Sequence, residues 1–111
     1  MERTITIDGK AVRFVSTAGT LLRYREYFGH GMMEDAQTLI DRAKTGTVDD
    51  ESLEIFTRIA YTMAKQADPT ITGGVSEWLD QFELMSFYSI LPEIITLWSG
   101  SVMPTVTAKK K

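Results

Sequence analysis

Apolar residues recur at helical spacing between residues 50 and 67, and this pattern constrains the fold more than any other in the chain. They form one stripe that two isoleucines widen: Leu53, Phe56, Ala60, Met63 and Ala67, with Ile55 and Ile59. Asp49 or Asp50 is placed to cap the start of this helix, because a carboxylate accepts hydrogen bonds from first-turn N–H groups. Pro69 ends it, since proline lacks an amide hydrogen and biases Asp68 away from helical geometry.

Two short segments near the N-terminus alternate polar and apolar residues, as β-strands do. They are residues 4–8 and 11–15, and the Asp8-Gly9 pair between them suits a tight turn because both residues tolerate a left-handed backbone. The pattern therefore predicts a β-hairpin over residues 4–15. Isolated hairpins are marginal in water, so its apolar side chains must pack against the rest of the chain: Ile5, Ile7, Val12 and Phe14.

Two helices are expected between the hairpin and the central stripe. In the first, Leu21, Tyr24 and Phe28 fall at helical spacing, and Gly29 follows them. The second has its apolar residues between about 32 and 43, and Gly46 follows it. Glycine readily adopts the left-handed backbone found at the ends of helices, so Gly29 and Gly46 are predicted to end these two segments.

The last third of the chain predicts two further helical segments. Ser76 is placed to cap a short helix, and Ser86 is placed to cap the final one. Pro92 leaves a backbone carbonyl of the final helix without its usual partner, so we expect a kink or a break there. Ser99-Gly100 is expected to stop this helix.

The elements add up to an α+β domain that is mostly α, with an N-terminal β-hairpin packed on about five short helices. The chain has 111 residues, which leaves no room for a second domain. We expect a single globular domain over residues 1–100, with the hairpin at 4–15 and the helices at about 18–100. Residues 101–111 are polar, contain Pro104 and lack periodicity, so they are predicted to form a flexible tail.

Charge and cysteine content narrow the classes of function. Twelve Lys and Arg against fifteen Asp and Glu give a net charge of −3, and the chain is more acidic still without Lys109, Lys110 and Lys111. Such an acidic protein is a poor match for nucleic acid or for an anionic membrane. The absence of cysteine excludes disulfides, thiolate nucleophiles and cysteine-based zinc sites. No apolar run is long enough to span a membrane, and we expect a soluble protein that is not exported.

The residues that could carry catalysis are few. His30 is the only histidine and lies beside glycines in an expected turn between helices. Glu34 and Asp35 could join it as metal ligands, but acids near the start of a helix also complement the helix dipole. Residues 49–51 are acidic at the expected start of a helix, where a capping residue and first-turn acids stabilise it. Gly73-Gly74 is not accompanied by the other residues of a nucleotide-binding loop. We therefore expect no enzyme, no metal and no cofactor.

Methionine and aromatic residues give a different indication. The chain has six methionines, two tryptophans, four tyrosines and five phenylalanines, more than a small core easily encloses. Methionine surfaces adapt to varied partners and aromatic side chains anchor interfaces. Candidate partner-binding residues are Met32, Met33, Trp78, Phe82, Tyr88 and Trp98. The alternative, that most of these side chains belong to the core, stays open.

A series of motifs covers essentially the whole chain in a characteristic order. The N-terminal half contains Thr4–Lys10, Thr17–Thr20, Arg23–Arg25 and Phe28-Gly29, and the C-terminal half contains Ala60–Pro69, Glu77–Glu83, Leu91–Ile94 and Leu97-Trp98. In order and spacing the chain resembles the tail assembly chaperones of long-tailed bacteriophages and of prophages of Gram-positive bacteria. It departs from that pattern at Gly29-His30-Gly31, where Arg and Asp would be expected after the first glycine.

The resemblance implies a non-enzymatic assembly factor in the cytoplasm of the bacterial host. Such a protein keeps the tape measure protein soluble, helps recruit tail tube protein, and is absent from the mature virion; it is also compatible with self-association. The family implies a longer second product made by ribosomal frameshifting. The codons of Lys109, Lys110 and Lys111 are candidates for the slippery sequence, and the alternative is a solubilising basic tail.

Two other functions compete with this interpretation. The first is a structural virion component, such as a head-to-tail connector or a tail completion protein. The second is a small DNA-binding regulator that uses residues 21–43 as a helix pair. The acidic composition opposes this regulator, and its second helix carries only Arg42 and Lys44 as basic residues.

Overall fold

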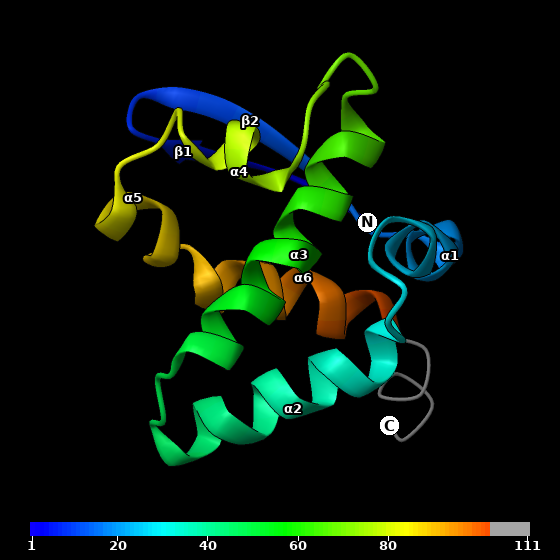
Figure 1. Cartoon of the computed structure of the whole chain (residues 1–111), viewed down its shortest axis with the longest axis vertical. Helices are drawn as coiled ribbons and strands as arrows, with labels where there is room; N and C mark the ends of the chain where they lie inside the picture. The colour runs from blue at the N-terminus through cyan, green and yellow to red at the C-terminus, as the bar shows by residue number, and fades with distance from the viewer. Residues whose placement is uncertain (103–111) are drawn as a thin grey trace, which may run out of the picture.

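The computed structural model describes residues 1–102 and has the predicted α+β architecture, in which a hairpin packs on helices (Figure 1). Two strands are followed by six helices within this range: β1 (Glu2–Ile7), β2 (Lys10–Val15), α1 (Ala18–Phe28), α2 (Met32–Thr45), α3 (Asp50–Ala67), α4 (Val75–Leu79), α5 (Leu84–Tyr88) and α6 (Leu91–Val102). Apart from its first two residues, the predicted tail lies outside the described residues, and so do its three terminal lysines.

The two strands form an antiparallel sheet joined by the predicted two-residue turn. Asp8 and Gly9 have φ values of 52° and 77°, and two consecutive left-handed residues match the right-handed twist of a hairpin. The register sets Ile5 opposite Val12 and Ile7 opposite Lys10. The predicted apolar face is confirmed, because three of its four side chains are buried and the fourth is half-buried: Ile5, Ile7 and Phe14, with Val12.

Helix α3 runs through the middle of the molecule and contacts β2, α1, α2 and α4 (Figure 1). Because neighbours lie on most sides of it, burial extends beyond the predicted stripe to Thr57, Tyr61 and Thr62. At the edges of the stripe, Leu53 and Ala67 are only half-buried. The sequence therefore predicted the helix correctly but gave it too narrow a buried face.

Four predicted helix boundaries are confirmed by the structure. Gly29 and Gly46 follow α1 and α2 with φ values of 71° and 74°, which is the left-handed region that glycine adopts without strain. Asp49 caps α3, because its carboxylate accepts a 2.8 Å hydrogen bond from the Ser52 N–H. At the other end α3 stops at Ala67, before Pro69, as expected.

The predicted starts of the later helices are wrong. Helix α4 begins after Gly74 rather than at Ser76, and the Glu77 carboxylate accepts the Gly74 N–H at 3.2 Å. Helix α5 begins after Glu83 rather than at Ser86. In such short helices several polar residues can serve as the cap, so the position of one serine does not fix the start.

The predicted break at Pro92 is confirmed, because α5 ends at Tyr88 and α6 begins as a separate helix at Leu91. Proline fits the first turn of α6, where no intrahelical partner is needed. The predicted stop at Ser99-Gly100 is wrong, since α6 continues to Val102. Leu97 and Trp98 are buried, and packing of this kind outweighs the low helix propensity of serine and glycine.

The hairpin turn is joined to the connection between α4 and α5. The Asp8 carboxylate accepts the backbone N–H of Glu83, and the Lys10 ammonium donates to the carbonyl of Gln81 at 2.9 Å. The same ammonium lies 5.8 Å from the centre of the Phe82 ring, within reach of a cation–π contact. These contacts link residues more than seventy positions apart in the sequence.

We predict that Asp8→Asn reduces stability more at neutral pH than at acidic pH. The Glu83 N–H, and then the Ser86 hydroxyl, lower the pKa of Asp8 below its ordinary 3.8. A lowered folded-state pKa stabilises the fold at pH values above 3.8, and this contribution is lost as the pH falls from 3.8 through the lower pKa of the folded state. Asparagine keeps the left-handed turn but not the charge. Urea unfolding of both proteins across this pH range checks the prediction, and an equal difference at all pH values would contradict it.

Candidate functional site

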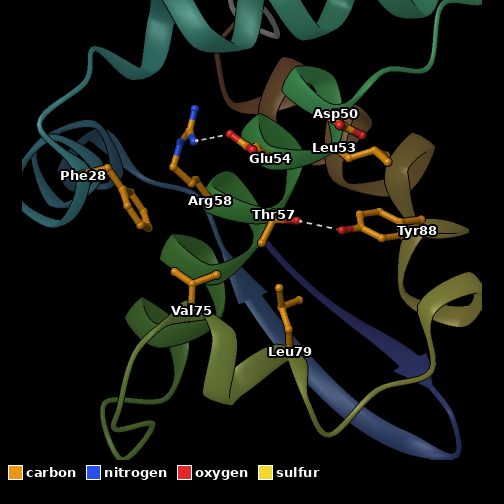
Figure 2. Close-up of a pocket in the computed structure, with 9 residues that line it drawn as sticks. All are labelled: Phe28, Asp50, Leu53, Glu54, Thr57, Arg58, Val75, Leu79 and Tyr88. Atoms are coloured by element: carbon orange, nitrogen blue, oxygen red, sulfur yellow. Dashed lines mark hydrogen bonds and ion pairs between the residues drawn. The ribbon is translucent and has the colours of Figure 1, made fainter.

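An open groove lies along the exposed face of α3 and is the candidate functional site, here named the α3 groove (Figure 2). Its volume is about 430 Å³. Four helices contribute its lining side chains, which are Phe28, Asp50, Leu53, Glu54, Thr57, Arg58, Val75, Leu79 and Tyr88. It therefore depends on residues from distant parts of the sequence, which the fold brings together.

Helical spacing places these side chains on common faces. In α3, residues 50, 53, 54, 57 and 58 follow the spacing i, i+3, i+4, i+7 and i+8, so they share one side of the helix. Val75 and Leu79 lie one turn apart on α4 and form a second wall. Phe28 ends α1 on one side of the groove, and Tyr88 reaches it from α5 on the other (Figure 2).

The apolar lining residues are neither fully buried nor fully exposed. Phe28, Leu53, Val75, Leu79 and Tyr88 are all half-buried, so each keeps some apolar surface in contact with water. Covering that surface with an apolar partner is favourable by about 25 cal/mol for each square ångström removed from water. The groove therefore offers a concave apolar surface for a partner side chain or helix face.

Tyr88 is held in place by the core beneath it. Its hydroxyl lies 3.4 Å from the Thr57 hydroxyl, and its ring packs against Phe56 and Phe87 with centroids 5.8 and 5.2 Å away. Contacts of this kind restrict the ring, so this wall of the groove is already formed in the free protein.

A polar network beside the groove holds Arg58, which is the one cation among the described lining residues. The Tyr24 hydroxyl donates to Asp35 Oδ2 at 2.6 Å, and Arg58 Nε donates to the Tyr24 hydroxyl at 3.1 Å. Arg58 Nη2 lies 3.5 Å from the same carboxylate oxygen. The network joins α1, α2 and α3, and Asp35 compensates the charge of Arg58.

The environment keeps Tyr24 neutral over the physiological range. Burial, with a further contribution from the hydrogen bond to Asp35, raises the pKa of this phenol well above its ordinary value of 10.0. The hydroxyl therefore remains a hydrogen-bond donor to Asp35, and the network functions as a structural clamp.

Two carboxylates give the rim of the groove an acidic character. Asp50 and Glu54 both line it and are exposed. Glu54 Oε1 lies 3.7 Å from Arg58 Nη1, but its side chain is 70% exposed, so this pair is weak. Because Asp35 already compensates Arg58, the rim favours a partner that carries positive charge.

The six residues that were predicted from the sequence to bind a partner do not lie together in the structure. Met32, Trp78 and Trp98 are only 2%, 4% and 9% exposed, so the structure places these three candidates in the core. Trp78 is buried because it packs edge-on against Tyr61 and Phe87. The alternative interpretation of these three residues, as core, is confirmed.

The other three candidates keep some exposed surface but do not form one site. Tyr88 lines the α3 groove, whereas half-buried Phe82 lines a different groove beside β2. Met33 is 50% exposed on α2 and lines neither groove. Sequence reasoning missed Phe28, Leu53, Val75 and Leu79 as site residues, because their apolar character does not distinguish a groove wall from the core.

The acidic residues and the histidine form no metal-binding cluster in the described part of the chain. Within residues 1–102, no three His, Asp or Glu side chains are placed to hold a metal ion. His30 is exposed in the turn between α1 and α2. Asp49 caps α3 and pairs with Arg42, whose guanidinium also contacts Glu51 at 2.7 Å, so this acidic cluster has structural roles.

No match was found among protein-family models, curated proteins or solved structures. Across residues 1–102, none of the helices has both the length and the apolar composition of a membrane-spanning segment.

We predict that Tyr24→Phe destabilises the fold by about 1–3 kcal/mol, because it leaves Asp35 and Arg58 without their shared partner. Tyr27→Phe is the matched control, since Tyr27 is 37% exposed and, among residues 1–102, its hydroxyl takes part in no comparable network. The control should change stability by less than about 0.5 kcal/mol. Urea denaturation measures both, and equal effects would contradict a structural role for the network.

Proposed function

We propose that this protein is a phage tail assembly chaperone that uses the α3 groove to cover apolar segments of the tape measure protein. The observation that carries the proposal is a concave apolar surface that stays open in a small acidic domain. The order of the sequence motifs supports it independently. The proposed activity makes and breaks no covalent bond.

The physical requirement on such a chaperone is reversible masking. A tape measure protein is long and helical, and before assembly it exposes apolar surface that would aggregate. The α3 groove matches one helix face, and the apolar surface continues onto α5, where Leu84 lies one turn before Tyr88. Leu84 and Met85 are 68% and 77% exposed, so they add apolar surface that a partner can contact.

Weak and repeated binding suits the displacement step. Several copies along one extended client gain strength through avidity, while each copy dissociates readily when tail tube protein polymerises. The net charge of −3 helps to keep such a complex dispersed. On this proposal the protein acts in the cytoplasm of the bacterial host, is absent from the finished virion, and has a longer form made by frameshifting at the codons of Lys109, Lys110 and Lys111.

We predict that coexpression with the tape measure protein of the same phage raises the soluble yield of that protein, and that Leu79→Asn weakens this effect. Leu79 is a half-buried wall of the groove, so a polar side chain there removes apolar contact. Val48→Asn is the matched control, because Val48 is 77% exposed and does not line the groove. Sedimentation of lysates and copurification measure the effect.

Three results would contradict the proposal. The first is an unchanged soluble yield with no copurification. The second is an equal effect of the two substitutions, which would remove the groove from the binding site. The third is detection of the protein by mass spectrometry in purified virions, because this would favour a head-to-tail connector or a tail completion protein.

A further inference from the structure

The hairpin register fixes which backbone groups of β2 point away from β1. Met1 and Ser16 exchange both of their backbone hydrogen bonds, at 2.9 and 2.8 Å. Hydrogen-bonded and non-hydrogen-bonded pairs alternate along an antiparallel ladder. Counting from that pair, Val12 bonds to Ile5, whereas the N–H and C=O of Ala11 and Arg13 point outward.

The outer side of β2 has room for another chain. A groove of about 330 Å³ runs along it, and Ala11 and Arg13 are among its lining residues. In the described part of the chain, the backbone groups of Ala11 and Arg13 bond to nothing outside the hairpin. Helix α3 packs against β2, and the groove lies between this strand and the segments around and after the end of α3. The Arg3 side chain of β1 contacts Glu93 of α6 at 3.3 Å.

The groove beside β2 also has an apolar wall. Half-buried Val12, Ile71 and Phe82 line it together with buried Trp78. An exposed sheet edge recognises an extended peptide through two features. Its free main-chain groups form hydrogen bonds with the peptide backbone, and neighbouring apolar pockets accept alternate side chains. An α-helix would leave the outward N–H and C=O groups unmatched, because a helix satisfies its own backbone internally.

We propose that the outer edge of β2 binds an extended, acidic segment of a partner chain as a third strand. This inference does not depend on the chaperone function, since it concerns a different groove and an extended rather than a helical occupant. The outward groups of Ala11 and Arg13 would pair with the incoming backbone, and alternate side chains of the segment would contact Val12 and Phe82.

Charge selects the acidic partner over a second copy of this chain. The groove is lined by Lys10 and Arg13 and by one acid, Asp68, in a protein that is otherwise acidic. Arg13 pairs with Glu2, but both side chains are about half exposed, so an incoming carboxylate can compete for the guanidinium. A second copy would bring two more cations to the same edge, an arrangement by which proteins avoid edge-to-edge pairing.

The probe for this site is a synthetic peptide that alternates Glu with Val and Ile. Amide hydrogen exchange is followed by NMR in the full chain, with and without the peptide. In the free protein the Ala11 and Arg13 amides should exchange faster than those of Val12 and Phe14, and the peptide should slow them. A peptide of the same sequence with alternate backbone nitrogens methylated should not bind, since it keeps the side chains but lacks the donors.

Two variants of Ala11 separate backbone pairing from side-chain contact. Ala11→Pro removes one outward N–H and leaves the β1 ladder intact, as proline is tolerated at outward positions of an edge strand. It should weaken peptide binding about tenfold, the loss expected for one hydrogen bond. Ala11→Thr keeps the N–H and should bind as tightly as the parent. Circular dichroism verifies that both variants remain folded.

Three outcomes would overturn the inference. Failure of the acidic peptide to protect Ala11 and Arg13 at millimolar concentration would show that the edge does not accept a strand. Equal binding of the methylated peptide would show that side chains alone are recognised. Protection that rises with the protein's own concentration, without peptide, would assign the edge to self-association. All three results are independent of whether the tape measure protein is solubilised.

Discussion

Burial around nearly the whole circumference of α3 is the constraint on which the structure depends. A helix of this kind cannot fold alone, because its apolar surface requires cover from several directions. The hairpin, α1, α2 and α4 supply that cover and are thereby fixed relative to one another. A face of α3 that is left partly open forms the α3 groove, so the same helix organises the core and lines the proposed binding surface.

Polar contacts between distant segments determine how these covering elements are oriented. The hydrogen bonds among Tyr24, Asp35 and Arg58 join α1 and α2 to α3. On the other side of the molecule, Asp8 and Lys10 hold the connection between α4 and α5 against the hairpin turn. Apolar packing alone is non-directional, whereas these hydrogen bonds specify one arrangement of the helices.

Local chemistry explains which features could be predicted from the sequence. Gly29, Gly46 and Asp49 end or begin helices through their own backbone or side-chain preferences, and their roles were predicted correctly. Whether Met32 and Trp98 are buried depends on segments far away in the chain, so their apolar character alone could not show whether they lie in the core or on the surface. The groove was missed for the same reason, since it exists only after four helices converge.

The long-range position of the hairpin has a consequence for synthesis on the ribosome. Its apolar side chains pack toward α3, its turn bonds to Glu83, and Arg3 reaches Glu93. The hairpin is translated before α3 and α6, so its residues leave the ribosome well before all their native contacts can form. Until α3 has been translated, Ile7 and Phe14 lack the neighbours that bury them in the folded protein, so the nascent chain exposes an apolar segment.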